Sequence, residues 1–304
     1  MSLATAAVLA GGTTLAAYLN AKFHVSKDVN SLWGIKKGER EYARAVNNGR
    51  GNTWFIFTET VKKYPNMVCM WSREGIYTYK EVQDRACQYA NFFLSKGVKK
   101  GDLVAFYLQN RPEFIIAWLG LWSIGCGPAA INYNLTGDAL VHCLKISGAK
   151  LVLVDDDAGC RERIDGSRDI LAGELGMDLL DMDSAFQSTL STYSTSFPPK
   201  DLAMGMKGEF PSMLLYTSGT TGMPKGCAFT MSRLYTTTFL RRASVGGKDG
   251  PDGDRWYSCM PLYHGTAAIS LVVCLISGVS IAIGKKFSVS NFWRDIRDSD
   301  STTF

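Results

Sequence analysis

The chain has 304 residues, 46% hydrophobic and 20% charged, values typical of a globular protein that can bury a sizeable core. The net charge is +5, and the lysines and arginines are scattered rather than gathered in a run with aromatic residues, which argues against nucleic acid as a partner. The eight cysteines form no C-x-x-C pair and predict reduced core side chains, and the three dispersed histidines give no zinc-site spacing.

Residues 1–22 are a candidate membrane anchor. Residues 3–19 carry no charge and reach the short edge of the ~17–25 residues that cross a bilayer. Basic residues follow at Lys22, Lys27, Lys36, Lys37, Arg40 and Arg44. By the positive-inside rule, they would leave the bulk of the chain in the cytosol. A soluble amphipathic helix or a disordered lead is the alternative. Residues 23–53, polar and dotted with glycine, are predicted to be a connector.

From residue 54 onward, short apolar runs alternate with segments of helical periodicity. The expected helices cover 54–63, 79–96, 112–125 and 136–147, and the expected strands cover 68–71, 76–79, 103–108, 128–131 and 150–155. The first two strands flank Arg73-Glu74-Gly75, which indicates a hairpin. Strands that alternate with helices predict an α/β fold with parallel-rich sheets covered by helices on both faces.

The second half of the chain is less regular at its start. Residues 156–209 are predicted to be a surface excursion with short apolar patches. Beyond them, strands are expected at 213–216, 256–260 and 279–283, helices at 232–242, 266–275 and 291–297, and an exposed loop at 246–253. The last four residues, 301–304, are β-prone but have no predicted partner.

The most informative stretch follows the strand at 213–216. It reads Thr217-Ser218-Gly219-Thr220-Thr221-Gly222-Met223-Pro224-Lys225-Gly226. Its glycines let the backbone approach an anion and turn N–H groups toward it, its hydroxyls can donate to phosphate oxygens, and Lys225 adds a mobile positive charge. It is not a Walker A motif, because Lys225 is followed by glycine instead of a hydroxyl residue. A solvated linker is the alternative, although linkers do not usually follow a buried strand. The pattern predicts a polyphosphate site.

The segment from Tyr216 to Gly226 resembles the signature of the AMP-forming acyl-adenylating enzymes, which include acyl-CoA synthetases, luciferases and peptide-synthetase adenylation domains. The resemblance implies that residues 54–304 form the N-terminal portion of an AMP-binding domain, incomplete at the C-terminus and without the C-terminal catalytic lid domain. It implies ATP and Mg²⁺ as cofactors and CoA as co-substrate. The residues that would hold the ATP phosphates are Thr217, Ser218, Gly219, Thr220, Thr221, Gly222 and Lys225.

Two further segments extend the resemblance, and one of them points to a particular branch of the superfamily. Met260-Pro261-Leu262-Tyr263-His264 ends a predicted strand, where open α/β sheets place their ligands, and a similar superfamily segment lines the acyl and nucleotide side of the site. His264 is therefore the candidate catalytic residue, with a packed loop histidine as the alternative. The stretch from Ile131 to Leu144 resembles the fatty-acid transport protein and very-long-chain acyl-CoA synthetase branch, as do Gln109–Phe114 and Asn291–Arg297. Within it, His142 is predicted to be a satisfied helix residue rather than a functional one.

This branch implies activation of a long or very long fatty acid. The acid and ATP form acyl-AMP and pyrophosphate, CoA accepts the acyl group, and uptake is driven by thioester formation. The expected setting is a membrane of the endoplasmic reticulum, peroxisome, lipid droplet or cell surface, with the bulk of the chain cytosolic. The residues indicate no metal ligand and no particular oligomeric state.

The family's motifs for ribose, for Mg²⁺ and for the adenylating lysine are not matched, and Glu209 is the last glutamate in the chain. The 304-residue chain alone is therefore expected to be inactive. Two alternatives stay open. One is a non-catalytic, membrane-associated lipid- or nucleotide-binding fragment, and the other is an adenylating ligase for a different carboxylic acid.

Overall fold

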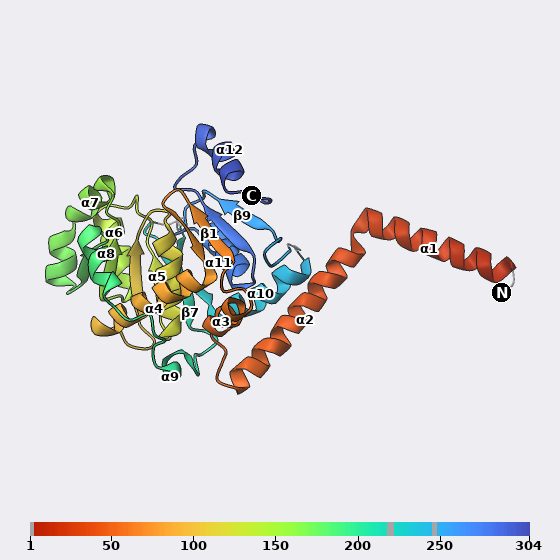
Figure 1. Ribbon diagram of the computed structural model, residues 1–304, viewed down its shortest axis with the longest axis horizontal. Helices are drawn as coiled ribbons and strands as arrows, with labels where there is room; N and C mark the ends of the chain where they lie inside the picture. Colours follow the sequence, from red (N-terminus) through yellow and green to blue (C-terminus); the bar gives the residue numbers. More distant parts are fainter. Residues whose placement is uncertain (1–2, 218–221, 245–247) are drawn as a thin grey trace.

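The computed structural model describes residues 3–217, 222–244 and 248–304. In these ranges the chain folds into two β-sheets with helices packed around them, and an arm of two helices extends from this body to the N-terminus (Figure 1). The predicted α/β class with parallel-rich sheets is confirmed.

The larger sheet has six strands in the order β6-β5-β3-β4-β7-β8. Their bounds are β3 (Leu103–Tyr107), β4 (Gly127–Ala130), β5 (Leu151–Val154), β6 (Asp178–Asp181), β7 (Pro211–Thr217) and β8 (Lys225–Thr230). All neighbours run parallel except β7 and β8, which form an antiparallel hairpin. The central strands β3, β4 and β5 are almost wholly buried, which explains their unbroken apolar sequences.

The smaller sheet has the order β2-β1-β10-β9, formed by β1 (Val68–Ser72), β2 (Gly75–Thr78), β9 (Arg255–Ser258) and β10 (Ser280–Ile283). β1 and β2 form the predicted hairpin, and the other pairs are parallel. Beyond β9, Thr303 forms a parallel bridge with Trp256, and its carbonyl accepts a hydrogen bond from the N–H of Tyr257 at 2.8 Å. The expectation that 301–304 has no partner is therefore wrong.

The α-helices of the body are α3 (Trp54–Lys63), α4 (Tyr79–Ser95), α5 (Pro112–Ser123), α6 (Gly137–Ser147), α7 (Ala158–Asp165), α8 (Ser184–Ser191), α9 (Lys200–Ala203), α10 (Met231–Ser244), α11 (Gly265–Ile276) and α12 (Val289–Asp298), and a short π-helix, η1, covers Ile170–Glu174. Every residue of α5 is buried. The indole N–H groups of Trp118 and Trp122 both donate to the carbonyl of Ser212, at 2.7 and 3.1 Å. Because Ser212 lies on β7, these two bonds fix the central helix against the strand that leads into the predicted phosphate loop.

The arm consists of α1 (Leu3–Phe23) and α2 (Val25–Asn47), which meet at His24. α2 lies along α10, and a Cβ added at Gly38 would come within 3.0 Å of the carbonyl oxygen of Thr236 on α10. The predicted connector at 23–53 is therefore largely helical. The only buried residues of α2 are two glycines, Gly34 and Gly38. The helix therefore lacks the apolar stripe by which a packed helix is recognised in a sequence.

α1 occupies the segment predicted as a candidate membrane anchor. Among the residues that the structure describes, no helix combines the length and apolarity needed to cross a membrane. Glycine and threonine at positions 11–14 dilute the leucines and alanines of α1.

Two strands were not expected from the sequence. β6 lies within the predicted surface excursion 156–209 and pairs in parallel with β5 at one edge of the larger sheet. β8 follows the predicted phosphate loop directly, where no strand was expected. Both are edge strands with little burial, and their sequences therefore carry weak periodic signals.

Candidate functional site

The predicted phosphate-binding stretch is the loop between β7 and β8. Thr217 ends β7, Lys225 begins β8, and the two residues are partners in the antiparallel register. Both are exposed. The other predicted residues before Gly222 lie outside the described ranges, namely Ser218, Gly219, Thr220 and Thr221. The hairpin therefore brings both ends of the loop together at the carboxyl end of β7, an edge at which α/β sheets bind ligands.

Gly222 has a φ of 128°, a backbone conformation that side-chain-bearing residues rarely adopt. A Cβ built on it would meet no described atom within 4 Å, so the requirement for glycine comes from the backbone and not from crowding. Glycine, hydroxyl groups and the Lys225 ammonium together provide donors and positive charge. This chemistry suits a phosphate group.

Helix α6 contacts both limbs of this hairpin. The hydroxyl of Tyr216, next to Thr217 on β7, donates to the carbonyl oxygen of Cys143 at 3.0 Å. The Nε2 of His142 lies 3.0 Å from the carbonyl oxygen of Pro224, next to Lys225. Burial raises the pKa of Tyr216, so its hydroxyl stays protonated and able to donate. The prediction that His142 is a satisfied helix residue agrees with this contact.

The segment ending in His264 lies beside the same hairpin. His264 precedes the first residue of α11, Gly265, and a Cβ added at Gly265 would come within 2.9 Å of the Cδ1 of Leu215 on β7. The ring of Tyr263 packs edge-on against that of Tyr133 with centroids 5.3 Å apart. The side chain of His264 is exposed. Segments that follow β4 and β9, which belong to different sheets, therefore meet beside β7.

Asn110 ties the two sheets together at this edge. Its side-chain amide donates to the carbonyl oxygens of Met260 at 2.8 Å and Gly284 at 3.0 Å, and its side-chain oxygen accepts from the N–H of Leu262 at 2.8 Å. Asn110 is 3% exposed and follows β3, whereas Met260 and Gly284 follow β9 and β10. In the sequence, this asparagine is marked only by its place in Gln109–Phe114, one of the segments that carry the resemblance. A polar residue directly after a buried strand is the signal that could have identified it.

Next to Asn110, a charged hollow of about 380 Å³ lies at the carboxyl ends of β3, β5 and β10. Arg111 dominates it, with ion pairs to Asp156 at 2.8 Å and Glu113 at 3.2 Å and a longer contact to Asp155 at 3.6 Å. Burial alone would lower the pKa of Arg111, but these carboxylates raise it overall, so the guanidinium stays charged. Lys285 also lines the hollow. Four acids line the hollow against two bases, but Arg111 lies within ion-pair distance of three carboxylates, which favours a structural network.

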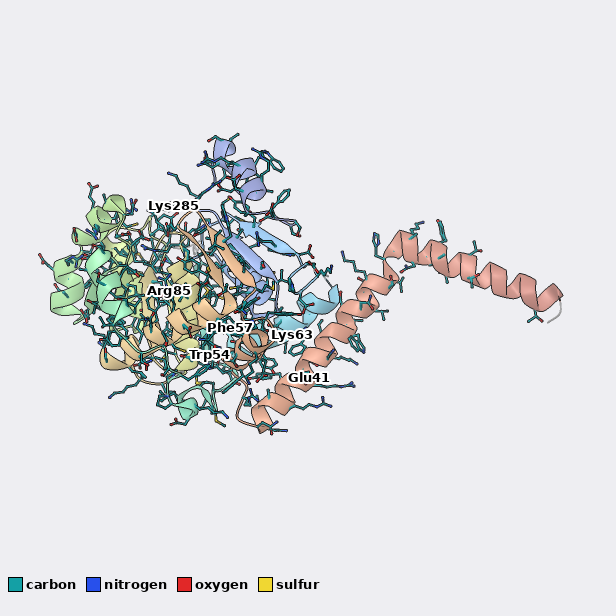
Figure 2. All side chains as sticks on the ribbon, in the orientation of Figure 1. Glu41, Trp54, Phe57, Lys63, Arg85 and Lys285 are labelled. Atoms are coloured by element: carbon teal, nitrogen blue, oxygen red, sulfur yellow. The ribbon has the colours of Figure 1, made fainter. Side chains whose placement is uncertain are left out.

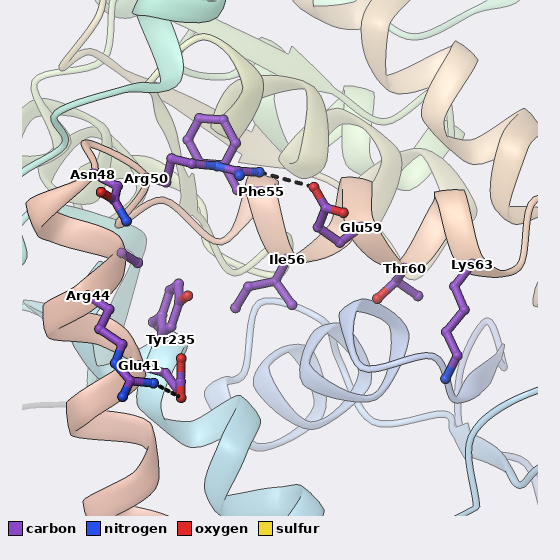
Figure 3. A pocket seen from close by; sticks show the side chains of 11 residues that line it. Glu41, Arg44, Asn48, Arg50, Phe55, Ile56, Glu59, Thr60, Lys63 and Tyr235 are labelled. Carbon is purple, nitrogen blue, oxygen red and sulfur yellow. Dashed lines mark hydrogen bonds and ion pairs between the residues drawn. The ribbon is translucent and has the colours of Figure 1, made fainter.

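A second hollow, of about 590 Å³, lies where the arm meets the body, between α2, α3 and α10 (Figure 3). Two ion pairs line it, Arg44–Glu41 at 2.9 Å and Arg50–Glu59 at 3.1 Å. None of its lining residues belongs to the three motifs, and Glu41 here is well separated from Lys285 of the charged hollow (Figure 2). This hollow is therefore distinct from the predicted site.

No cluster of three histidine, cysteine, aspartate or glutamate side chains within the described ranges could hold a metal ion. The hairpin thus offers donors and a cation for a polyphosphate, and its described residues include no metal site.

Residues 57–304 match the family model of the AMP-binding enzymes, and the chain belongs to this family. Among curated proteins, it is 38% identical over 303 residues to isopenicillin N epimerase component 1 of Hapsidospora chrysogena, covering 99% of this chain and 44% of that protein. It is 31% identical over 298 residues to the very long-chain fatty acid transport protein of Cochliobolus heterostrophus, covering 96% of this chain and 45% of that protein. The chain thus spans under half the length of these relatives.

Solved structures share the fold. The N-terminal domain of FACL13 from Mycobacterium tuberculosis, bound to an inhibitor, matches with a TM-score of 0.72 at 22% identity, over 82% of this chain and 61% of that one. O-succinylbenzoate CoA synthetase from Bacillus subtilis, in complex with ATP and magnesium, matches with a TM-score of 0.66 at 22% identity, over 82% of this chain and 62% of that one.

Proposed function

We propose that this chain is the nucleotide-binding part of an enzyme that activates a long-chain or very-long-chain fatty acid. The acid and ATP would form acyl-AMP and pyrophosphate, and CoA would then accept the acyl group. The family match and the fatty acid transport relative support this proposal. The observation that carries it is the β7–β8 hairpin, in which Thr217 and Lys225 face each other at a strand end within the matched region.

In this proposal the ATP phosphates lie against the hairpin loop. Backbone N–H groups and hydroxyls donate to phosphate oxygens, and the Lys225 ammonium offsets their charge. The proposed phosphate-binding residues are Thr217, Ser218, Gly219, Thr220, Thr221, Gly222 and Lys225. Mg²⁺ would neutralise further phosphate charge. His264 is proposed to lie near the acyl carboxylate, because its segment begins α11 beside β7.

We also propose that the 304-residue chain binds MgATP without turning it over. Catalysis of adenylation needs metal and cations around the phosphates as charge develops. Glu209 is the last glutamate in the chain.

A ligase for another carboxylic acid is the second candidate. The relative with 38% identity is named for isopenicillin N, whereas the fatty acid transport relative is 31% identical. The phosphate chemistry would be the same in both cases. The difference would lie in the residues that receive the acid.

Membrane association is proposed through the arm. Large apolar side chains on both arm helices are exposed, among them Leu15, Tyr18, Phe23, Leu32 and Trp33. Lysines lie between them along the same helices. Exposed apolar and aromatic side chains can bury against a bilayer, and nearby lysines are attracted to anionic lipid headgroups.

The test is calorimetric binding of MgATP to the purified chain, followed by acid-dependent ATP–pyrophosphate exchange. The proposal predicts MgATP binding that oleate or lignocerate strengthens, and no exchange. Strengthening by isopenicillin N instead would favour the second candidate. Binding of fatty acid without nucleotide would favour a non-catalytic lipid-binding protein. A folded chain that binds no MgATP would contradict the proposal.

A further inference from the structure

Two consecutive residues of α6 make hydrogen bonds to the two opposite limbs of the β7–β8 hairpin. The Cys143 carbonyl accepts from Tyr216, one residue before the loop begins, and the His142 ring reaches Pro224, one residue before Lys225. Both separations are 3.0 Å. A single turn of one helix therefore spans the base of the loop.

The carbonyl oxygen of Pro224 determines which ring nitrogen of His142 carries a hydrogen. A carbonyl oxygen can only accept, so the Nε2 of His142 must carry the hydrogen in this contact. Proline has no backbone N–H, so Pro224 contributes only its carbonyl at this position. The contact to His142 thus supplies a partner for Pro224 just before the strand begins.

Packing supports these contacts. The side chain of Ile146, one turn after His142 on α6, would lie 4.0 Å from a Cβ added at Gly226. β8 is an edge strand whose first three residues are exposed, and β7 and α6 both contact it. An edge strand needs such contacts to keep one register.

We propose that α6 acts as a clamp on the β7–β8 hairpin, with His142 and Tyr216 as positioning residues that hold its two limbs in place for polyphosphate binding. This inference rests on the proposed function, because it assigns His142 and Tyr216 a role in nucleotide binding. Neither residue touches the reacting atoms in this role. Each fixes one limb, and together they set the distance across which Thr217 and Lys225 face each other.

The test uses variants of the full 304-residue chain. His142→Ala and Tyr216→Phe each remove one bond, and each should weaken MgATP binding by roughly three- to tenfold, as expected for one hydrogen bond. His142→Gln keeps an N–H donor at similar reach and should restore most of the affinity. Lys145→Ala, at an exposed position in the last turn of the same helix, is the matched control and should bind MgATP like the wild type.

Amide hydrogen exchange without nucleotide provides the second measurement. His142→Ala should speed exchange over 222–230 and leave β3 and β4 protected. Unchanged exchange in that segment would overturn the clamp. Faster exchange with unchanged MgATP affinity would overturn its role in binding. If the folded wild type bound no MgATP, the proposed function and the binding role would both fall, and exchange would still decide whether α6 holds the hairpin.

Discussion

The side-chain oxygen of Asn110 accepts a hydrogen bond from the backbone N–H of Leu262 at 2.8 Å. This bond crosses from the larger sheet to the smaller one, because Asn110 follows β3 and Leu262 follows β9. Two further bonds from the same amide, to Met260 and Gly284, leave most of its hydrogen-bonding capacity satisfied in a buried place. The segment that carries His264 therefore depends on one asparagine of another sheet for its position.

Asn110→Ala should lower the free energy of unfolding by ~2–4 kcal/mol, because it leaves buried backbone partners without their bonds. Urea denaturation followed by circular dichroism measures this. Asn91→Ala is the control, since Asn91 also bridges two carbonyls, of Ser194 and Ser196, but at a partly exposed position. Asn91→Ala should lower the free energy of unfolding by under about 1 kcal/mol. Equal losses in the two variants would contradict the special role of Asn110.

Gly38→Leu should displace α2 from α10, because any Cβ there meets the backbone of Thr236 at about 3.0 Å. The arm helix contains several lysines and arginines, so trypsin should cleave within 25–47 several-fold faster. Gly12→Leu on α1 is the control, since a Cβ at Gly12 meets no described atom within 4 Å. Equal cleavage of both variants would argue against the packing of α2 on α10.

Thiol labelling should distinguish one cysteine from the rest. All eight are free, and only Cys227 is exposed. Burial raises the pKa of Cys87 and Cys126 to about 12 and that of Cys143 to about 11. The thiolate is the reactive form, so at pH 8 roughly one in ten thousand of the Cys87 and Cys126 thiols would be ionised even if reagent reached them.

Iodoacetamide at pH 8 should therefore modify one thiol rapidly, and Cys227→Ser should abolish that fast phase. The other thiols should react only on unfolding. If several thiols of the folded Cys227→Ser protein reacted rapidly, the other cysteines would be accessible to the reagent and not buried.

The arm gives a prediction about membranes. The chain should bind vesicles that contain anionic phospholipid, and deletion of residues 1–22 should weaken this binding, because the deletion removes exposed Leu15, Tyr18 and Leu19. Carbonate washing should release the bound protein, in keeping with a helix that lies on the surface. Protein that resists carbonate would point to a spanning segment. No binding to vesicles would remove the membrane proposal.

Much of the fold could be predicted because its core elements have strong local signals. α5 and the strands β3 and β5 are continuous apolar runs, and the turn at Arg73-Glu74-Gly75 marks the hairpin of β1 and β2. α2 could not be predicted in this way, because it buries glycines instead of an apolar stripe. β6 and β8 were not predicted, because edge strands have few buried positions and so a weak apolar pattern.

The candidate site, like the fold, could be predicted only in part from the sequence. Glycine, hydroxyl and lysine in the stretch 217–226 indicate phosphate chemistry without any knowledge of the fold. The roles of Asn110 and His142 depend on residues far away in the sequence, at Leu262 and Pro224. No local pattern contains such pairings, so only the folded structure reveals them.

The most direct test of the central claim, that the β7–β8 hairpin binds the phosphates of ATP, is the MgATP dissociation constant of Lys225→Ala beside Lys207→Ala. Both lysines are exposed, but Lys207 lies before the amino end of β7, away from the loop. Lys225→Ala should bind MgATP roughly ten- to hundredfold more weakly, as expected for loss of a charge-assisted contact, and Lys207→Ala should match the wild type. An unchanged dissociation constant in a folded Lys225→Ala protein would contradict the account.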